Sequence, residues 1–437
     1  MKKIYIDTLG CAKNEYDSQM LAASLIERGC SIVYDPQDAD IMIVNTCGFI
    51  EDAKKESIER IFELADEKGR NMKLVVTGCL SERYHDELAA EMPEVDMFFG
   101  VNDYDDLPDI LVSDQDHSGD LVGENLDDLR YRKRDLGEGA HYGYLKIAEG
   151  CNNACSFCAI PSIRGPFRSK RIEDCVREAQ DMADAGIREL ILIAQDTSQY
   201  GRDLYGELRL PELLRKLCRV EGIEWIRLMY VYDNSITDEL IDTIAAEPKI
   251  CTYLDIPVQH ISDHVLHLMR RQSTGKSIRQ TIEKLRSRIP DIHIRTTFLV
   301  GFPGETEENF SELLDFIDTA QLDRVGAFAF SDEEGTPSFG FDGKLDEDVK
   351  ESRRNTLMEH QLYVSEALNE KKIGRVFEVI VDENIEDGLY AGRTRYDSPE
   401  IDCEVTFRSS LSHAAGDIVK VRIDNAYEYD LEGEEVI

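Results

Sequence analysis

Three cysteines near the middle of the chain have the clearest chemical potential: Cys151, Cys155 and Cys158, in the run CNNACSFC. Three thiolates so close together can wrap one metal cluster. A 4Fe-4S cluster normally takes four cysteines, so three leave one iron open to bind another molecule. Zinc is the alternative metal, but zinc sites usually add a further cysteine pair or histidines. No such partner is close in sequence, although His141 precedes the adjoining predicted strand, so the spacing favours an iron–sulfur cluster.

A second set consists of Cys11, Cys47 and Cys79, which are far apart in sequence but share one context. Each directly follows a predicted parallel strand, in IYIDTLGC, IMIVNTC and LVVTGC. Loops after adjacent parallel strands converge at one edge of the sheet, and helix N-termini there favour thiolates. Isolated cysteines are ordinarily small buried hydrophobes, and five others show no ligand spacing and are interpreted that way: Cys30, Cys175, Cys218, Cys251 and Cys403.

The predicted helices and strands indicate an α/β protein of several domains. Residues 4–8, 41–45 and 73–77 are expected strands with amphipathic helices between them, which predicts a doubly wound parallel-sheet domain over residues 1–112. Residues 113–139 are polar and are predicted to be a linker.

From residue 140 to residue 370 the alternation has a longer period. It predicts a partial (β/α)6 barrel, closed by a helix over 346–370, with the CNNACSFC loop on the carboxyl-end face where barrel active sites lie. Residues 371–437 are predicted to form a small all-β barrel. The six expected barrel strands are 142–148, 189–194, 225–231, 252–258, 293–300 and 324–330.

Composition and charge exclude several classes of protein. The chain has 437 residues, 42% of them hydrophobic, and no apolar run near the roughly 18–20 residues of a membrane span. We expect no signal peptide, no membrane association and a cytoplasmic location, where disulfides are rare. The net charge is −38, and the part from Lys371 onward holds 8 basic and 16 acidic residues. Such acidity repels phosphate backbones and attracts a basic protein, unless it serves only solubility.

The central motif resembles the radical S-adenosylmethionine (SAM) superfamily, in which CxxxCxxC follows the first strand of a six-unit barrel. The resemblance implies that the open iron binds the amino and carboxylate groups of SAM, and that an electron from the cluster splits it to a 5′-deoxyadenosyl radical. Phe157 stands where the family places an aromatic near the adenine. Gln195, Asp196 and Arg295 are candidate cofactor contacts, although buried polar residues in a barrel often only pair with each other.

A closer resemblance covers nearly the whole chain and is to the methylthiotransferases, which carry two 4Fe-4S clusters. It rests on LGCAKNEYDS, NTCGFI, TGCL, YLDIPVQH, RTTFLVGFPGETEENF and the tail GDIVKVRIDNAYEYDLEG, which is similar to the TRAM β-barrel. It implies that Cys11, Cys47 and Cys79 hold a second cluster, whose open iron carries a sulfur that one SAM methylates. The radical from a second SAM then removes a hydrogen from the substrate, and the carbon radical collects the methylthio group.

Within that family, DTSQYG, EEGTPS and GRTRYDSPEID resemble the branch that modifies the β-carbon of an aspartate in small-subunit ribosomal protein twelve. The implied partners are this basic protein, or the subunit carrying it, and an electron donor such as flavodoxin or ferredoxin, with no direct nucleic-acid substrate. Two alternatives stay open. One is methylthiolation of a tRNA adenosine, and the other is a non-catalytic, metal-stabilised ribosome assembly factor.

Two further patterns are discounted. The histidines His260, His264 and His267 imitate a helical metal face, but the first ends a predicted strand. The turn at 301–304 precedes a predicted helix with Thr306 as its cap, and it borders the cofactor or is purely structural.

Overall fold

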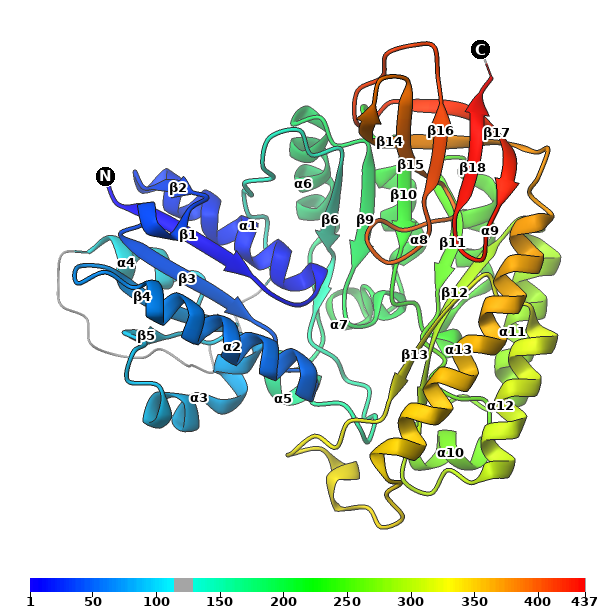
Figure 1. Cartoon of the computed structure of the whole chain (residues 1–437), viewed down its shortest axis with the longest axis horizontal. Coiled ribbons are helices and arrows are strands. Elements are labelled where there is room, and N and C mark those ends of the chain that lie inside the picture. The colour runs from blue at the N-terminus through cyan, green and yellow to red at the C-terminus, as the bar shows by residue number, and fades with distance from the viewer. Residues whose placement is uncertain (114–128, 437) are drawn as a thin grey trace.

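The computed structural model describes residues 1–113 and 129–436, so most of the predicted linker lies outside the described residues. The N-terminal domain is a parallel five-stranded sheet of order β2-β1-β3-β4-β5 (Figure 1). Helices α1 and α4 pack on one face of the sheet, and α2 and α3 pack on the other, which confirms the doubly wound prediction. The elements are β1 (Lys3–Thr8), α1 (Ala12–Glu27), β2 (Ser31–Val33), β3 (Ile41–Thr46), α2 (Glu51–Glu67), β4 (Lys73–Gly78), α3 (Cys79–Glu91), β5 (Met97–Phe98) and α4 (Leu107–Val112).

The central domain is an open, six-stranded parallel sheet of order β6-β9-β10-β11-β12-β13, with β6 and β13 at its edges. This confirms the partial (β/α)6 barrel. Its strands are β6 (Tyr142–Lys146), β9 (Glu189–Ile193), β10 (Trp225–Leu228), β11 (Ile250–Asp255), β12 (His293–Val300) and β13 (Arg324–Ala329). The main helices are α6 (Ile172–Asp184), α8 (Leu210–Leu217), α9 (Asp238–Ala246), α11 (Gly275–Arg288), α12 (Glu307–Ala320) and α13 (Glu347–Glu370).

Shorter elements complete this domain, and two of them frame the cysteine loop: β7 (Ala148–Glu149) pairs with β8 (Arg168–Ser169), and α5 (Ile160–Arg164) lies between them. Two more short helices are α7 (Arg202–Tyr205) and α10 (Asp263–Leu268). Strand β10 ends three residues earlier than the predicted 225–231, because Tyr230 adopts a left-handed backbone with φ of 57° that cannot continue a strand.

One face of the barrel sheet is covered by helices, and the other face is partly accessible. The outer face packs on the helices in one large apolar core. The inner face carries a smaller cluster that includes Ile191, Trp225 and Tyr253. Along β12 buried and half-buried residues alternate, and Phe328 on β13 is 52% exposed. The inside of the barrel is therefore accessible along β12 and β13.

The C-terminal domain is a closed five-stranded barrel, as predicted, of order β14-β15-β16-β18-β17. It packs against the amino ends of the central strands: Arg393 pairs with Glu189 at 2.8 Å, and Arg324 pairs with Asp397 at 2.7 Å. The opposite, carboxyl ends stay free for the cysteine loops. The strands are β14 (Val376–Glu386), β15 (Leu389–Thr394), β16 (Val405–Arg408), β17 (Ile418–Ala426) and β18 (Leu431–Glu435). Among the described helices, none is long and apolar enough to cross a membrane.

Candidate functional site

The three N-terminal cysteines lie in neighbouring loops because β1, β3 and β4 are adjacent in the sheet. Cys11 is the N-cap of α1, Cys47 follows β3, and Cys79 is the first residue of α3. The loops pack closely: a β-carbon on Gly10, whose φ is +94°, would lie 2.7 Å from the Cys47 β-carbon. Glycine is therefore required beside Cys11, and the sheet brings this trio of thiols together.

Burial controls the acidity of these thiols. It raises the pKa of Cys47 to about 12, and the nearby thiols of Cys79 and Cys11 add to the rise. Burial also raises the pKa of Cys79, against the opposing charge of Arg164. Thiols of this kind are protonated at neutral pH, and a metal must displace their protons to bind.

The central cysteines occupy the loop after β7. Ser156 fixes this loop, because its N–H donates to the Met269 carbonyl at 3.0 Å and its hydroxyl donates to the Leu268 carbonyl at 2.8 Å. Burial raises the pKa of Cys151 to about 11 and that of Cys158 to about 12. The third thiol, Cys155, lies 3.8 Å from an Nη atom of Arg271.

Both trios have the donor chemistry of iron–sulfur clusters, which are held by cysteine thiolates. The thiols of Cys79 and Cys11 are near enough to Cys47 to raise its pKa, and those of Cys155 and Cys151 are near enough to Cys158 to raise its pKa. Among the described residues, no three His, Cys, Asp or Glu side chains converge as they would around a single metal ion.

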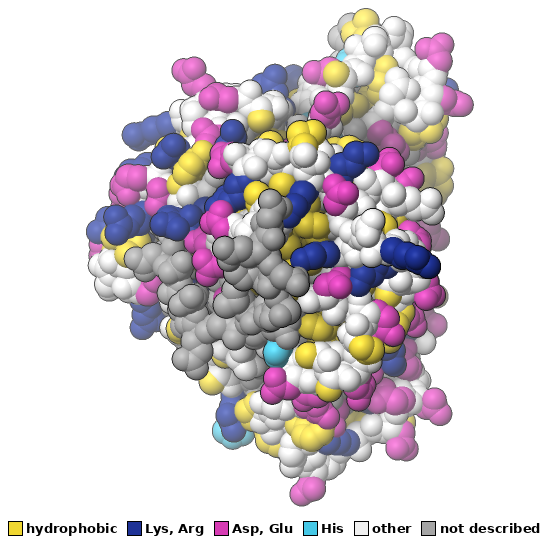
Figure 2. Space-filling view, turned by 90° about the vertical axis from the view of Figure 1, so that its left-hand side faces the viewer, with side chains coloured by type: hydrophobic (Ala, Val, Ile, Leu, Met, Phe, Trp, Pro, Cys, Tyr) yellow, Lys and Arg dark blue, Asp and Glu magenta, His cyan; other side chains and the backbone are white. Residues whose placement is uncertain are grey.

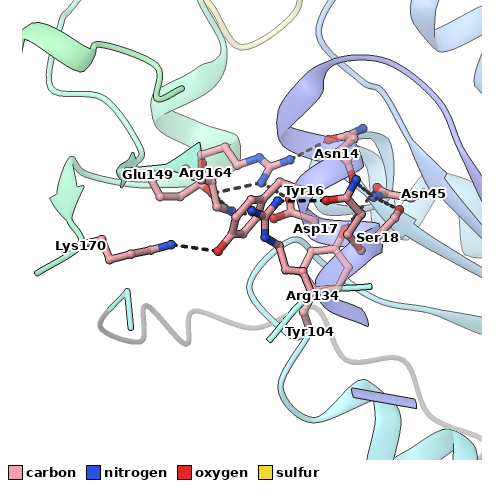
Figure 3. Close-up of polar contacts among 12 residues, drawn as sticks. Asn14, Tyr16, Asp17, Ser18, Asn45, Tyr104, Arg134, Glu149, Arg164 and Lys170 are labelled. Carbon is pink, nitrogen blue, oxygen red and sulfur yellow. Dashed lines mark hydrogen bonds and ion pairs between the residues drawn. The ribbon is translucent and has the colours of Figure 1, made fainter. Parts of the chain in front are cut away.

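A buried polar network joins the two domains beside the cysteine loops (Figure 3). Its centre is Arg164, the last residue of α5, which is 2% exposed. Its guanidinium donates to Asp17 at 2.6 Å, to the Asn14 side chain at 2.8 Å and to the Cys79 sulfur at 3.3 Å. Arg164 thus brings a positive charge from the barrel to the N-terminal trio.

Lys146, at the end of β6, completes this network. Its ammonium donates to Asp17 and to Glu149, each at 2.6 Å. Glu149 also accepts from Arg164 at 3.3 Å and from the Gln195 amide at 2.7 Å. Two cations therefore balance two buried carboxylates, and these cations hold the pKa of Glu149 well below its usual range despite burial.

The predicted SAM contacts lie in different settings. Phe157 packs edge-on to Phe302, with ring centroids 6.4 Å apart. Gln195 presents a buried Oε1 that has no hydrogen-bond partner within residues 1–113 and 129–436, which fits an amine or hydroxyl donor of SAM. Asp196 accepts from the Asn153 amide at 2.8 Å, so it is tied to the cysteine loop.

Arg295 on β12 has acidic partners. It pairs with Asp255 at 2.9 Å and with Asp402 of the C-terminal domain at 3.4 Å. The structure also places the two discounted patterns. Thr306 caps α12 as predicted. His260 is fully buried, and its Nε2 lies 3.4 Å from a carboxylate oxygen of Glu305.

Comparisons with known proteins agree with this arrangement. Residues 3–100 match an uncharacterised protein family, UPF0004, residues 145–317 match the radical SAM superfamily, and residues 373–436 match the TRAM domain. Ribosomal protein uS12 methylthiotransferase RimO of Clostridioides difficile is 45% identical over 99% of both chains. RimO of Caldanaerobacter subterraneus subsp. tengcongensis is 47% identical over 99% of this chain and 100% of its own. This chain belongs to the uS12 methylthiotransferase family.

The fold of this methylthiotransferase also resembles solved structures. The radical SAM methyltransferase TsrM from Kitasatospora setae matches with a TM-score of 0.59 at 14% identity, over 75% of this chain and 73% of that one. Such a distant likeness concerns the fold alone.

Several residues of the methylthiotransferase site escaped the sequence prediction. Arg164, Asp17 and Lys146 show no ligand spacing, and each gains its role only through the contact between two domains. The available signal was indirect: Asp17 lies six residues after Cys11, and Arg164 lies six residues after Cys158.

Glu15, beside the site on α1, gives this methylthiotransferase a pH-dependent stability. Burial raises its pKa from 4.5 to about 7, and the Glu400 carboxylate adds to the rise. The folded chain therefore holds this proton more tightly than the unfolded chain, and stability falls as pH rises from about 4.5 to 7. We expect Glu15→Gln to be about 1 to 2 kcal/mol more stable than the native chain at pH 8, allowing for solvent screening, and nearly equal at pH 5. Urea unfolding at both pH values measures this, and equal stability at pH 8 would contradict it.

Proposed function

We propose that this chain attaches a methylthio group to the β-carbon of an aspartate in ribosomal protein uS12, with SAM as methyl donor and radical source. The observation that carries the proposal is the pair of three-thiol sets on a chain that is 45% identical, over 99% of both lengths, to a uS12 methylthiotransferase. An unactivated C–H bond is too weak an acid for general-base chemistry, so the reaction needs a radical.

Each thiol trio has a separate task in this proposal. Cys151, Cys155 and Cys158 would hold a 4Fe-4S cluster, which would supply the electron for SAM cleavage, and the N-terminal trio would hold a second cluster, which would supply the sulfur of the methylthio group. Phe157, Gln195, Asp196 and Arg295 bind or position SAM. Both clusters must face one cavity in this proposal, because a short-lived radical demands close positioning. The N-terminal trio is Cys11, Cys47 and Cys79.

Each domain has its own task in this proposal: residues 1–112 carry sulfur, residues 140–370 bind SAM, and residues 371–437 contact the protein substrate. Acidic side chains are spread over the face drawn in Figure 2, with basic ones among them. A net charge of −38 favours a basic partner such as a ribosomal protein over nucleic acid. We place the reaction in the cytoplasm, with a flavodoxin or ferredoxin as electron donor.

A substrate comparison tests this function. The protein is reconstituted anaerobically with iron and sulfide, given SAM and a reductant, and offered uS12 and bulk tRNA separately. We expect mass spectrometry to find one added methylthio group on an aspartate of uS12 and none on tRNA. Label on tRNA instead would show that this chain modifies nucleic acid. Zinc in place of iron, with no SAM cleavage, would favour an assembly factor.

A further inference from the structure

Lys13 places a positive charge beside the N-terminal cysteine loop, on a side chain that is largely buried. It is the second residue of α1, two positions after Cys11, and only 8% of it is exposed. Its side chain reaches the barrel, where its ammonium lies 3.5 Å from the centre of the Tyr230 ring. The lysine therefore spans from the N-terminal cysteine loop to the carboxyl end of β10.

This ammonium differs from the other buried lysine ammonium groups nearby. Lys146 donates to Asp17 and Glu149, and Lys170 donates to Tyr16 at 2.9 Å and to Glu178 at 2.6 Å. Within residues 1–113 and 129–436, the Lys13 ammonium has the face of Tyr230 as its partner and no hydrogen bond or ion pair. An ammonium has three donors, and a lysine side chain that is this little exposed normally has an anionic partner. The ammonium of Lys13 can therefore pair with an anion from outside the chain.

The aromatic partner of Lys13 is held in a strained position. Tyr230 has a φ of 57°, which is uncommon for a residue with a side chain. Its N–H donates to the Asp255 carboxylate at 3.1 Å, and its carbonyl accepts from the Thr197 hydroxyl at 3.1 Å. Strain that neighbouring contacts maintain is a frequent mark of a ligand site.

The surroundings admit a peptide segment. Ala12 and Tyr230 both pack on the inner apolar cluster of the barrel, so the ammonium lies at the barrel's inner face. That face is half-buried along β12 and open at Phe328. In the inference drawn below, an extended segment enters from this exposed side and presents one acidic side chain to Lys13.

We propose that Lys13 binds the carboxylate of the substrate aspartate and so selects the residue to be modified. The inference rests on the proposed function, since it assumes that the target is an aspartate of uS12. The β-carbon of an aspartate is bonded directly to its carboxyl carbon. A carboxylate held by Lys13 therefore keeps the reacting carbon beside the cysteine loops, and asparagine, which carries no charge, is bound more weakly.

Binding measurements on the reconstituted holoenzyme test this proposal. Native and Lys13→Met proteins are titrated with uS12 and with a uS12 variant whose target aspartate is replaced by asparagine. We expect the native protein to bind the aspartate form at least about tenfold more tightly, as a buried charged pair allows. Lys13→Met should bind both forms equally, and Lys13→Arg should recover part of the preference. Lys55→Met is the matched control, since Lys55 is an exposed lysine of the same domain, and it should keep the full preference.

Two outcomes would overturn the role of Lys13. The native protein would bind both forms of uS12 equally, or Lys13→Met would keep the preference for aspartate. If Lys13→Met keeps that preference and also binds SAM at least tenfold more weakly, the ammonium would be assigned to the carboxylate of SAM. Methylthiolation of uS12 by the native protein in the same preparation is scored separately. Its absence would refute the proposed function, whereas its presence with any of these outcomes would refute only the role of Lys13.

Discussion

Alanine at Cys151, Cys155 and Cys158 is expected to abolish the formation of 5′-deoxyadenosine from SAM. In the proposed function these thiols hold the cluster that reduces SAM, and a cluster without its ligands cannot supply the electron. The loss should exceed the roughly 10- to 100-fold effect of changes around a metal site that leave its ligands intact. Chromatography of the reaction after anaerobic reconstitution measures the product.

The companion variant, alanine at Cys11, Cys47 and Cys79, is expected to retain SAM cleavage and to lose transfer of sulfur to uS12. Its iron content should fall by about the amount lost from the central variant, because the proposed function assigns one cluster to each trio. Alanine at Cys30, Cys218 and Cys403 is the control, since these cysteines belong to neither trio, and it should keep both activities. Deoxyadenosine from the central variant, or methylthiolated uS12 from the N-terminal variant, would contradict the assignment of the trios.

Replacement of Arg164 by methionine is expected to lower the free energy of unfolding by about 3 to 5 kcal/mol, the usual effect of breaking a buried ionic network. Arg164 faces Asp17 and Glu149, and without it only Lys146 remains to balance the two buried carboxylates. Methionine fills a similar space, so the change in the free energy of unfolding comes from the lost charge and hydrogen bonds. Urea unfolding followed by circular dichroism measures it.

Arg215→Met provides the comparison for Arg164. Arg215 pairs with Glu239 at 2.9 Å, but both side chains are largely exposed, at 40% and 61%. An exposed pair contributes about 0 to 1 kcal/mol, so this variant should unfold almost as the native chain does. If Arg164→Met and Arg215→Met had equal effects, the network beside the cysteines would not stabilise the domain interface. Lysine at position 164 should restore little, because it lacks the planar fork that reaches several partners at once.

The sequence by itself determined the local parts of this protein. The alternation of short apolar runs with amphipathic segments predicted both parallel sheets and the C-terminal barrel. A cysteine directly after each of three strands predicted that Cys11, Cys47 and Cys79 would lie in neighbouring loops, as β1, β3 and β4 place them. These features follow from backbone periodicity and from the convergence of parallel strands at one edge, and both are visible in short stretches of chain.

Only the tertiary structure decided how the domains meet. Arg164 contacts the sulfur of Cys79 from 85 positions away in sequence, and Lys146 contacts Asp17 from 129 positions away. The ammonium of Lys13 lies over Tyr230, and the C-terminal barrel covers the amino ends of the central strands rather than the carboxyl ends. Such contacts depend on which surfaces of already folded domains fit together in shape and charge, and no periodicity within one segment encodes that fit.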